Sequence, residues 1–496
     1  MNDERSKSLG AITAFLFTFV LVAIAFLGFF RFGFGADTMT HYLNPLINIE
    51  SKLPYARYIS YFIEITLYKM GIILPEHYRL FYILFLLVTA AAAFIYQQIF
   101  VGLLDEKGMK TDIIQEYFGR AILSLPFIST LYSEYFMFPE CFAFCVGFLF
   151  SAIAVLLYSR KKYIGVALFL IMAVFTYQVT VMISAVYMLL YVVVKYDFIL
   201  TAKMFWRGLI SSLSCIFAGF INYIVSRIFF YLGVITDTPK QISMGSVFDR
   251  IRHALYILKT FFISGNGLVP IPYANAVVAL SAVILIIVCN KDKIREAFTI
   301  LFAGMIMFCL AIVIPLIQSD APRVIFVLYA ALGCMVALSY VQLKGREKSI
   351  MQVVIVGAVF LQIFANQQIA VNHYISNAQD IACARAVLSA IDDYEKETGK
   401  TVTKIATCSD SVCYNHYENV YYTLEQINER VAVTVPYSLL EYVNKMDKGT
   451  TERRFKKSKK SPAKVRSEYF DGMEWDRFNV NEQLIIKGKT AYWCMY

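Results

Sequence analysis

Apolar runs long enough to cross a lipid bilayer recur along most of this 496-residue chain. A hydrocarbon core of ~30 Å needs about 20 mainly apolar residues in a helix. Hydrophobic residues make up 58% of the chain and charged residues only 17%, which excludes a soluble globular protein of this size. We place about eleven transmembrane helices near residues 9–30, 77–101, 117–133, 136–158, 163–177, 179–194, 208–232, 273–290, 297–317, 322–342 and 349–371.

The composition changes near residue 372, after which the chain resembles a soluble protein. The sequence therefore predicts an all-α polytopic membrane domain over residues 1–372 and a small α/β domain over residues 373–496. Four cysteines in the tail permit disulfides, with Cys408–Cys413 and Cys383–Cys494 as the pairs we expect. The tail elements expected are an amphipathic helix over 378–397 and strands over 402–406, 431–435 and 484–486.

Lysine and arginine residues concentrate in alternate short loops, which the positive-inside rule assigns to the cytoplasm. The first apolar run is longer than a signal-peptide core and lacks a small-residue cleavage pattern, so we expect it to remain as a span. With an odd number of spans, the N-terminus is cytoplasmic and the C-terminal domain is extracytoplasmic. The basic residues used are Arg5, Lys7, Lys107, Lys110, Arg160, Lys161, Lys162, Lys195, Lys203, Arg207, Lys291, Lys293, Arg295, Lys344, Arg346 and Lys348.

Two segments of the outer loops, Tyr58–Leu74 and Val247–Ile263, are amphipathic and charged, which predicts helices lying in the membrane interface. Residues 452–466 contain eight Lys or Arg and one Glu. Such a run either lies on anionic headgroups, attracts an anionic acceptor, or is a solvated loop.

Polar residues beside spans on the predicted outer side are the candidates for chemistry, because ionisable groups at membrane depth are costly and tend to be functional. Asp37 is either a general base or a helix cap, and it shares a helix face with His41 if residues 36–44 are helical. Arg323 either clamps a phosphate or extends to the headgroups. The full set is Asp37, His41, Arg57, Tyr58, Glu134, Glu140, Asp320 and Arg323.

Motifs for soluble-cofactor chemistry are absent from the sequence. It contains no HExxH, P-loop, dinucleotide fingerprint, GxSxG elbow or Asp-x-Asp pair. We therefore expect neither a metal site nor a cofactor. We expect instead a donor substrate that carries its own activated leaving group.

The outer-loop sequences GADTMTHYLNP and ARYISYFIE, followed by SEYFMFPE and DAPR turns, resemble the bacterial type II glucosyltransferase family, typified by phage serotype-converting enzymes. The likeness covers roughly residues 10–345 and lies in order and spacing. That family belongs to the GT-C class of membrane glycosyltransferases, which use polyprenyl-phosphate sugars. Relatives often have two adjacent acids in the first loop, where this chain has Ala36 and Asp37.

The resemblance implies inverting transfer of a hexose, glucose in the typical case, from a polyprenyl phosphate to an envelope glycan such as O-antigen, teichoic acid or capsule. The reaction would take place on the outer face of the bacterial cytoplasmic membrane. Asp37 would be the general base, with Glu134 as a second candidate, while Arg57 and Arg323 would hold the lipid phosphate. The partners expected are thus the donor lipid, the glycan acceptor and the bilayer, with no nucleic acid.

Two other classes of function remain open at this stage. Eleven spans could form a flippase or transporter of lipid-linked sugars, although no repeated half is visible. An envelope assembly or receptor protein would use the tail for binding and the spans for anchoring, which needs far fewer spans. A site gathering Asp37, Arg57 and Arg323 at the outer face favours the transferase.

Overall fold

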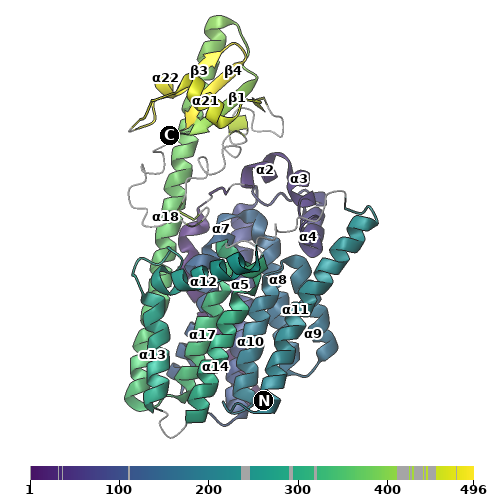
Figure 1. Cartoon of the computed structure of the whole chain (residues 1–496), viewed down its shortest axis with the longest axis vertical. Helices are drawn as coiled ribbons and strands as arrows, with labels where there is room; N and C mark the ends of the chain where they lie inside the picture. The colour runs from purple at the N-terminus through teal and green to yellow at the C-terminus, as the bar shows by residue number, and fades with distance from the viewer. Residues whose placement is uncertain are drawn as a thin grey trace.

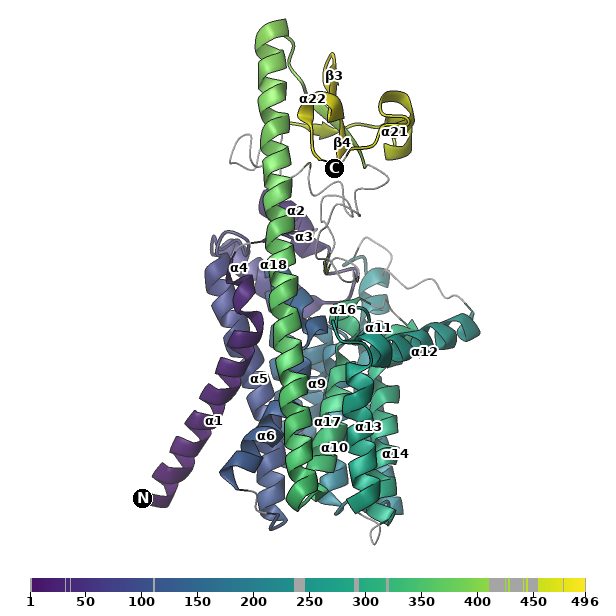
Figure 2. The same ribbon diagram turned by 90° about the vertical axis from the view of Figure 1, so that its left-hand side faces the viewer.

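The structure is a computed structural model of the chain, and it describes residues 2–31, 33–35, 37–109, 112–235, 246–289, 294–317, 321–409, 424, 427–428, 440, 443–444, 454–475 and 477–495. A bundle of long helices forms its main body, and a small sheet is carried beyond one end of the bundle (Figure 1). The N-terminus lies at the opposite end from the sheet (Figure 2).

Eleven helices of the described chain build the bundle. Seven segments are long and apolar enough to cross a membrane, namely 10–30, 78–106, 139–159, 202–231, 294–311, 322–342 and part of 345–398, and three shorter apolar helices accompany them. The bundle helices are α1 (Asn2–Phe26), α5 (Tyr78–Glu106), α6 (Ile113–Leu123), α8 (Phe142–Ser159), α9 (Tyr163–Thr176), α10 (Thr180–Lys195), α11 (Ala202–Tyr231), α13 (Ala274–Cys289), α14 (Ile294–Ala311), α17 (Val327–Gln342) and α18 (Gly345–Thr398).

Helix α17 is the centre of the bundle. In its candidate span, 94% of the residues are buried, whereas only 33% are buried in the spans of α1, α11 and α18. Helices α6, α10, α13 and α14 all pack against α17. Because α17 is surrounded by protein, its apolar residues form a core, while those of the outer helices are exposed, as a lipid-facing surface requires.

The predicted span over residues 117–133 is not one helix. Helix α6 ends at Leu123, and two 3-10 turns follow, Leu125–Ile128 and Thr130–Ser133. Pro126 lies at the start of the first turn, where it has no N–H with which to continue the helix. The carbonyl of Ile128 and the N–H of Thr130 instead bond to side chains of α18, at 2.8 Å to Asn366 and 2.9 Å to Gln362. The count of eleven spans therefore stays a prediction.

Short helices cluster at the end of the bundle that carries the sheet (Figure 1). Helix α12 agrees with its predicted range to within one residue at its C-terminal end, and it lies crosswise to the bundle (Figure 2). Ser246 caps its first turn and Gly265 ends it in a left-handed conformation with φ of 56°. The short helices are α2 (Thr38–Leu43), α3 (Pro45–Glu50), α4 (Tyr58–Lys69), α7 (Glu134–Met137), α12 (Val247–Ser264), α15 (Val313–Ile317) and α16 (Pro322–Ile325).

Helix α18 passes without a break through the predicted boundary at residue 372. The last predicted span and the predicted tail helix are one helix of 54 residues, because the intervening residues 372–377 include neither proline nor glycine. It ends at Gly399, whose φ is 66°. The chain then turns back into the sheet.

The sheet has four described strands in the order β2-β1-β4-β3. The C-terminal part of α18 covers one face, through Val387 and Ile391, and α21 (Pro462–Tyr469) covers the other, through Val465. Strand 431–435 of the prediction lies outside the described residues. The remaining elements are β1 (Lys404–Ser409), β2 (Lys456–Lys457), β3 (Leu484–Lys487), β4 (Thr490–Met495) and α22 (Val480–Gln483).

The cysteines of the tail are distributed over both faces of this sheet. Cys383 packs in the cluster on the α18 side, whereas Cys408 and Cys494 pack on the α21 side. The expected pair Cys383–Cys494 is therefore not brought together. Cys408 aligns instead with Cys494 on the neighbouring strand, and Cys413 lies outside the described residues.

Candidate functional site

The loop that precedes Asp37 is held against two helices by close packing. The N–H of Phe34 donates to Oδ1 of Asn377 on α18 at 2.7 Å. A methyl group at Gly33 would overlap the His373 ring, and one at Gly35 would overlap the Phe138 ring. These two glycines are therefore needed for close approach of the backbone, and they fix where the loop leaves the bundle.

Asp37 is exposed and stands directly before α2. The next residue, Thr38, is fully buried, and its hydroxyl lies 3.2 and 3.3 Å from the two carboxylate oxygens of Glu140. The same hydroxyl accepts from the N–H of Gly35 at 3.0 Å. Thr38 thus links the loop to Glu140, and the charge of Asp37 acts electrostatically on that carboxylate. The arrangement brings Asp37 and Glu140 to one place.

His41 lies in a separate, buried network. Its side chain is 2% exposed, and Nδ1 lies 3.2 Å from Oδ1 of Asn48, which also accepts from Nζ of Lys52 at 3.0 Å. The pKa of His41 is lowered to about 3, mainly by burial and then by the Lys52 charge, while the Asn48 hydrogen bond opposes both. His41 is therefore neutral near pH 7 and too weak a base to take a proton from a hydroxyl.

Lys52 connects this network to α4. Its Nζ lies 2.6 Å from Oε2 of Glu64, and both side chains are almost completely buried. Burial raises the pKa of Glu64, and the nearby positive charge of Lys52 lowers it. A buried pair of this kind costs several kcal/mol if one partner is removed, so it fixes α3 against α4.

Arg57 is positioned by the turn that begins α4. Ala56 before it has a positive φ of 57°, and its carbonyl accepts from Nδ2 of Asn222 on α11 at 2.8 Å. The hydroxyl of Ser60, one turn later, donates to the carbonyl of Thr176 at 2.7 Å. These bonds tie the turn to α9 and α11, and they set the direction in which the Arg57 side chain leaves the backbone.

The guanidinium of Arg57 is surrounded by aromatic rings. It lies 4.9 Å from the ring centroids of Tyr55 and Phe144 and 4.8 Å from that of Tyr177. Its Nε has no hydrogen-bond partner, and no carboxylate of the described chain is within ion-pair distance of it. Burial lowers its pKa, Tyr177 raises it, and the charge of Arg323 lowers it again. The group nonetheless stays charged, because an arginine does not lose its proton in proteins.

Glu134 holds Arg323 from a fully buried position. Its carboxylate accepts from the backbone N–H of Arg323 at 2.8 Å and forms an ion pair with the guanidinium. The hydroxyl of Tyr135 donates to the Arg323 carbonyl at 2.7 Å. The Arg323 side chain stays 30% exposed, so it can reach a ligand while Glu134 orients it.

The structure brings some of the candidate residues together and leaves others apart. Arg57, Arg323 and Glu134 all act electrostatically on Tyr177. Asp37 acts on Glu140, and Glu140 acts on Cys141 together with Glu134 and Arg323. His41 is one helical turn from Asp37 but faces the Asn48 network.

The two remaining predicted residues are Tyr58, which packs elsewhere, and Asp320. Tyr58 packs its ring against Phe175 and Phe229, with centroids 5.5 and 5.0 Å away. Asp320 lies outside the described residues.

Several residues of the site were not predicted from the sequence. Thr38, Phe144, Tyr177 and the Lys52–Glu64 pair carry no local signal, because their partners are distant in the chain. The acidic residue Glu64 inside an amphipathic segment was visible, but its partner was not. Among the described ranges, no three His, Cys, Asp or Glu side chains lie close enough together to hold a metal ion.

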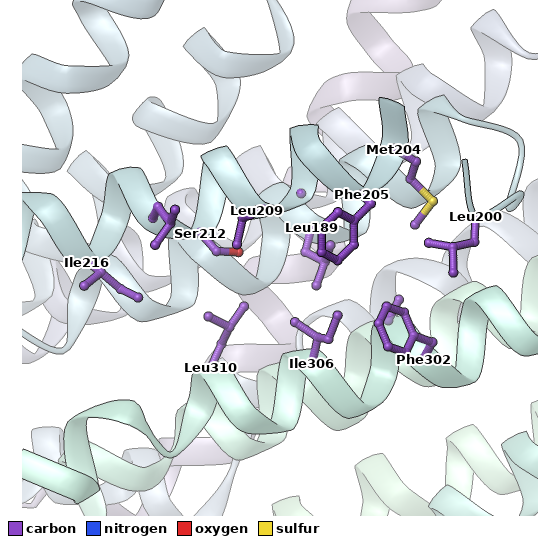
Figure 3. A pocket seen from close by; sticks show the side chains of 13 residues that line it. Leu189, Leu200, Met204, Phe205, Leu209, Ser212, Ile216, Phe302, Ile306 and Leu310 are labelled. Carbon is purple, nitrogen blue, oxygen red and sulfur yellow. The ribbon is translucent and has the colours of Figure 1, made fainter. Parts of the chain in front are cut away.

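Two apolar grooves lie on either side of α11, away from the polar residues. One, of about 190 Å³, lies between α10, α11 and α14, and Figure 3 shows Leu209 and Ser212 facing Ile306 and Leu310 across it. The other, of about 230 Å³, lies between α9 and α11. Leu189 in the first groove is nine residues beyond Thr180, the first residue of α10, which is about 14 Å along the helix, and Tyr177 precedes that helix. Neither groove is part of the charged site, and both suit hydrocarbon chains better than a sugar.

The chain was also compared with known proteins. No family model, no curated protein and no solved structure matches it. The fold itself, with seven described helices long and apolar enough to span a bilayer, fits a multi-pass membrane protein.

Proposed function

We propose that this protein is an integral-membrane, inverting glycosyltransferase. It transfers a hexose, glucose by family resemblance, from a polyprenyl phosphate to an envelope glycan on the extracytoplasmic face of the bacterial cytoplasmic membrane. The donor phosphate binds Arg57 and Arg323, and Asp37 is the general base.

The observation that carries the proposal is the proximity of two arginines from distant parts of the chain. The Tyr177 ring centroid lies 4.8 Å from the Arg57 guanidinium and 6.3 Å from that of Tyr135, whose hydroxyl donates to the Arg323 carbonyl. Only Arg323 has a carboxylate partner among the described residues. A buried guanidinium without a counterion is costly, and an anionic ligand removes that cost. Guanidinium groups bind phosphate bidentately, which makes a phosphate-bearing donor the natural ligand.

The chemistry follows from these positions. The Asp37 carboxylate takes the proton of an acceptor hydroxyl as the hydroxyl oxygen attacks the anomeric carbon. The bond from that carbon to the phosphate oxygen breaks with inversion, and the polyprenyl phosphate leaves with the electron pair. Arg57 and Arg323 stabilise the negative charge that develops on the phosphate, and a positioned base contributes ~10² to 10⁴ in rate.

A transfer assay with purified protein tests this proposal. The protein in lipid nanodiscs receives polyprenyl phosphate carrying radiolabelled glucose, together with cell-envelope glycan. We expect the label to leave the lipid and appear in the glycan, and Asp37→Asn to prevent this. A flippase of lipid-linked sugars, the alternative, moves labelled lipid between leaflets of proteoliposomes and leaves the label on the lipid. That result would overturn the transferase.

A further inference from the structure

Three lysines form a row across the sheet of the C-terminal domain. In the strand register, Lys456 of β2 aligns with Lys404 of β1, Lys404 aligns with Thr490 of β4, and Thr490 aligns with Lys487 of β3. Neighbouring strands are about 4.8 Å apart, so the row places positive charges at intervals of roughly 5 to 10 Å. All three lysines are exposed.

The row lies at the end of the sheet that points away from the helix bundle. Helix α18 rises from the bundle, the chain turns at Gly399, and β1 starts at Lys404 and runs back (Figure 2). Strand β4 runs parallel to β1 and ends near the C-terminus, which lies on the bundle side of the sheet (Figures 1 and 2). The first residues of β1 and β4 therefore lie at the end of the sheet farther from the bundle (Figure 2).

The side chains of the row share one face. Residues aligned in register point to the same side of a sheet, and Ala406 and Tyr492 place that side against α21. Nζ of Lys487 lies 4.8 Å from the ring centroid of Tyr469 in α21, and that ring stacks on Tyr492 at 3.9 Å. The lysine row thus adjoins a pair of aromatic rings, of which Tyr469 is partly exposed.

Among the described residues, Lys404, Lys456 and Lys487 form no ion pair. The nearby Glu468 acts on Lys487 electrostatically, but it pairs with Lys460 and lies 3.9 Å from Lys464. Lysines on edge strands also prevent a sheet from pairing with other chains. That role could explain Lys456 on β2 and Lys487 on β3, which are edge strands. It does not account for Lys404, because β1 is an inner strand.

We propose that this lysine row and the adjoining Tyr469 bind an anionic glycan polymer whose phosphate or carboxylate groups recur along the chain. The proposal rests on the glycosyltransferase function and names the class of its acceptor. Aromatic rings suit the apolar faces of sugars, and the lysines suit repeated negative charges. The C-terminal domain then captures the polymer beyond the end of the bundle that carries the Asp37 loop.

Lipid headgroups of the same membrane fit this surface less well. From residue 371, where the predicted span ends, α18 continues for 27 residues to Thr398, which is about 40 Å of helix. The row lies beyond most of that distance from the bundle (Figure 2). Electrostatic attraction to a membrane surface fades within ~8 Å at physiological salt, so the bilayer around the bundle does not reach the row.

A binding assay on the full chain tests the inference. Protein in nanodiscs of uncharged phosphatidylcholine is titrated into fluorescein-labelled polyphosphate, with neutral dextran as the contrasting probe. Lys456→Gln and Lys457→Gln are matched single variants, because adjacent residues of one strand point to opposite faces. We expect polyphosphate binding to weaken roughly fivefold for Lys456→Gln and by tenfold or more for the variant with Gln at 404, 456 and 487. Lys457→Gln should stay within about twofold of the wild type, and dextran should bind weakly to all of them.

The outcomes separate this inference from the proposed function. Wild-type polyphosphate binding by the triple variant overturns the lysine row as an acceptor site, whatever the transfer assay shows. The acceptor site is also overturned if the wild-type protein binds phosphatidylglycerol vesicles through these lysines but does not bind polyphosphate. Failure of sugar transfer with lysine-dependent polyphosphate binding intact overturns the transferase and leaves the surface in place. Size-exclusion profiles identical to the wild type show that the exposed substitutions have not unfolded the domain.

Discussion

Glu134 holds Arg323 at two points, accepting a hydrogen bond from its backbone N–H at 2.8 Å and pairing with its guanidinium. A carboxylate engaged in this way orients an arginine and is poorly placed to take a proton from a substrate. Asp37, by contrast, is exposed at the end of a loop whose preceding residues are tightly packed. Under the proposed transferase function, this geometry favours Asp37 as the base and Glu134 as the residue that positions Arg323.

Replacing Asp37 with Asn should reduce the transfer rate at saturating donor by ~10² or more, because an amide has no basic site near neutral pH. Asn keeps the size of Asp and can still cap a helix, so the free energy of unfolding should change by less than about 1 kcal/mol. Single-turnover transfer and thermal unfolding measure the two effects.

The variant Glu134→Gln is compared with Asp37→Asn in the same assays. It removes a charged acceptor from two hydrogen bonds, so it should lower stability by about 1–3 kcal/mol and weaken donor binding. If Asp37→Asn transfers sugar normally while a folded Glu134→Gln is inactive, the base is Glu134 and Asp37 is a cap.

Replacing Arg57 with Ala should raise the donor KM by roughly ten- to a hundredfold, because hydrogen bonds to charged groups contribute ~1.5–3 kcal/mol. Arg57→Lys should recover part of this loss, since it keeps the charge within the aromatic rings but not the planar fork. Arg31→Ala is the matched control, because Arg31 also lies over an aromatic ring, that of Tyr374 at 5.0 Å, but outside the site. Equal effects of Arg57→Ala and Arg31→Ala on KM would contradict a phosphate contact.

Replacing Gly35 with Ala should displace the loop that carries Asp37, because the added methyl group would overlap the ring of Phe138. We expect a loss of about 1–3 kcal/mol in stability and a larger proportional loss of transfer than of donor binding. Gly102→Ala serves as the control, since nothing lies within 4 Å of a methyl group there. Unchanged transfer in Gly35→Ala would show that the position of this loop does not matter for the reaction.

The burial of His41 predicts a pH dependence of stability. The pKa of His41 falls from 6.5 to about 3 in the folded protein, first through burial and then through the Lys52 charge. Because the folded pKa is lowered, this group favours folding fully above pH 6.5, and the contribution declines as the pH falls from 6.5 toward 3. Between pH 7 and pH 5 the wild type should lose about 1–2 kcal/mol from this group, and His41→Gln should lose less. Thermal unfolding at both pH values measures the difference, and identical losses would place His41 in a solvated environment.

The positions of the termini give a topological test. The N-terminus and the C-terminal sheet lie at opposite ends of the bundle (Figure 2). We therefore expect reporters fused at the N-terminus and at Asn372 to report from opposite sides of the membrane, with the N-terminus cytoplasmic by the lysine and arginine bias. A cytoplasmic signal at Asn372 would contradict this orientation and the placing of Asp37.

The sequence predicted best those features that depend on neighbouring residues. Helix α12 matched because its apolar stripe, its serine cap and its terminal glycine all lie within one segment. Helix α18 was divided wrongly into two helices, because the polar residues 372–377 suggest a membrane boundary although nothing in them breaks a helix. The segment 117–133 is not the single helix predicted, for the opposite reason, since Pro126 interrupts an apolar run.

The residues of the candidate site were also predictable only as far as local sequence allows. Asp37, Glu134, Glu140, Arg57 and Arg323 were selected individually by their positions beside spans, and this could be done without knowing the fold. That Glu134 pairs with Arg323, or that Phe144 and Tyr177 enclose Arg57, depends on helices that meet only after folding. Residue type and spacing carry no information about such contacts.

The unbroken helix α18 also fixes the angular orientation of the C-terminal domain. Each residue added to an α-helix advances it by 1.5 Å and turns everything beyond it by 100° about the helix axis. Changes in its length between the bundle and the sheet therefore rotate the lysine row toward or away from the Asp37 loop far more than they raise or lower it. Only insertions or deletions close to whole helical turns would therefore keep the direction in which the lysine row points.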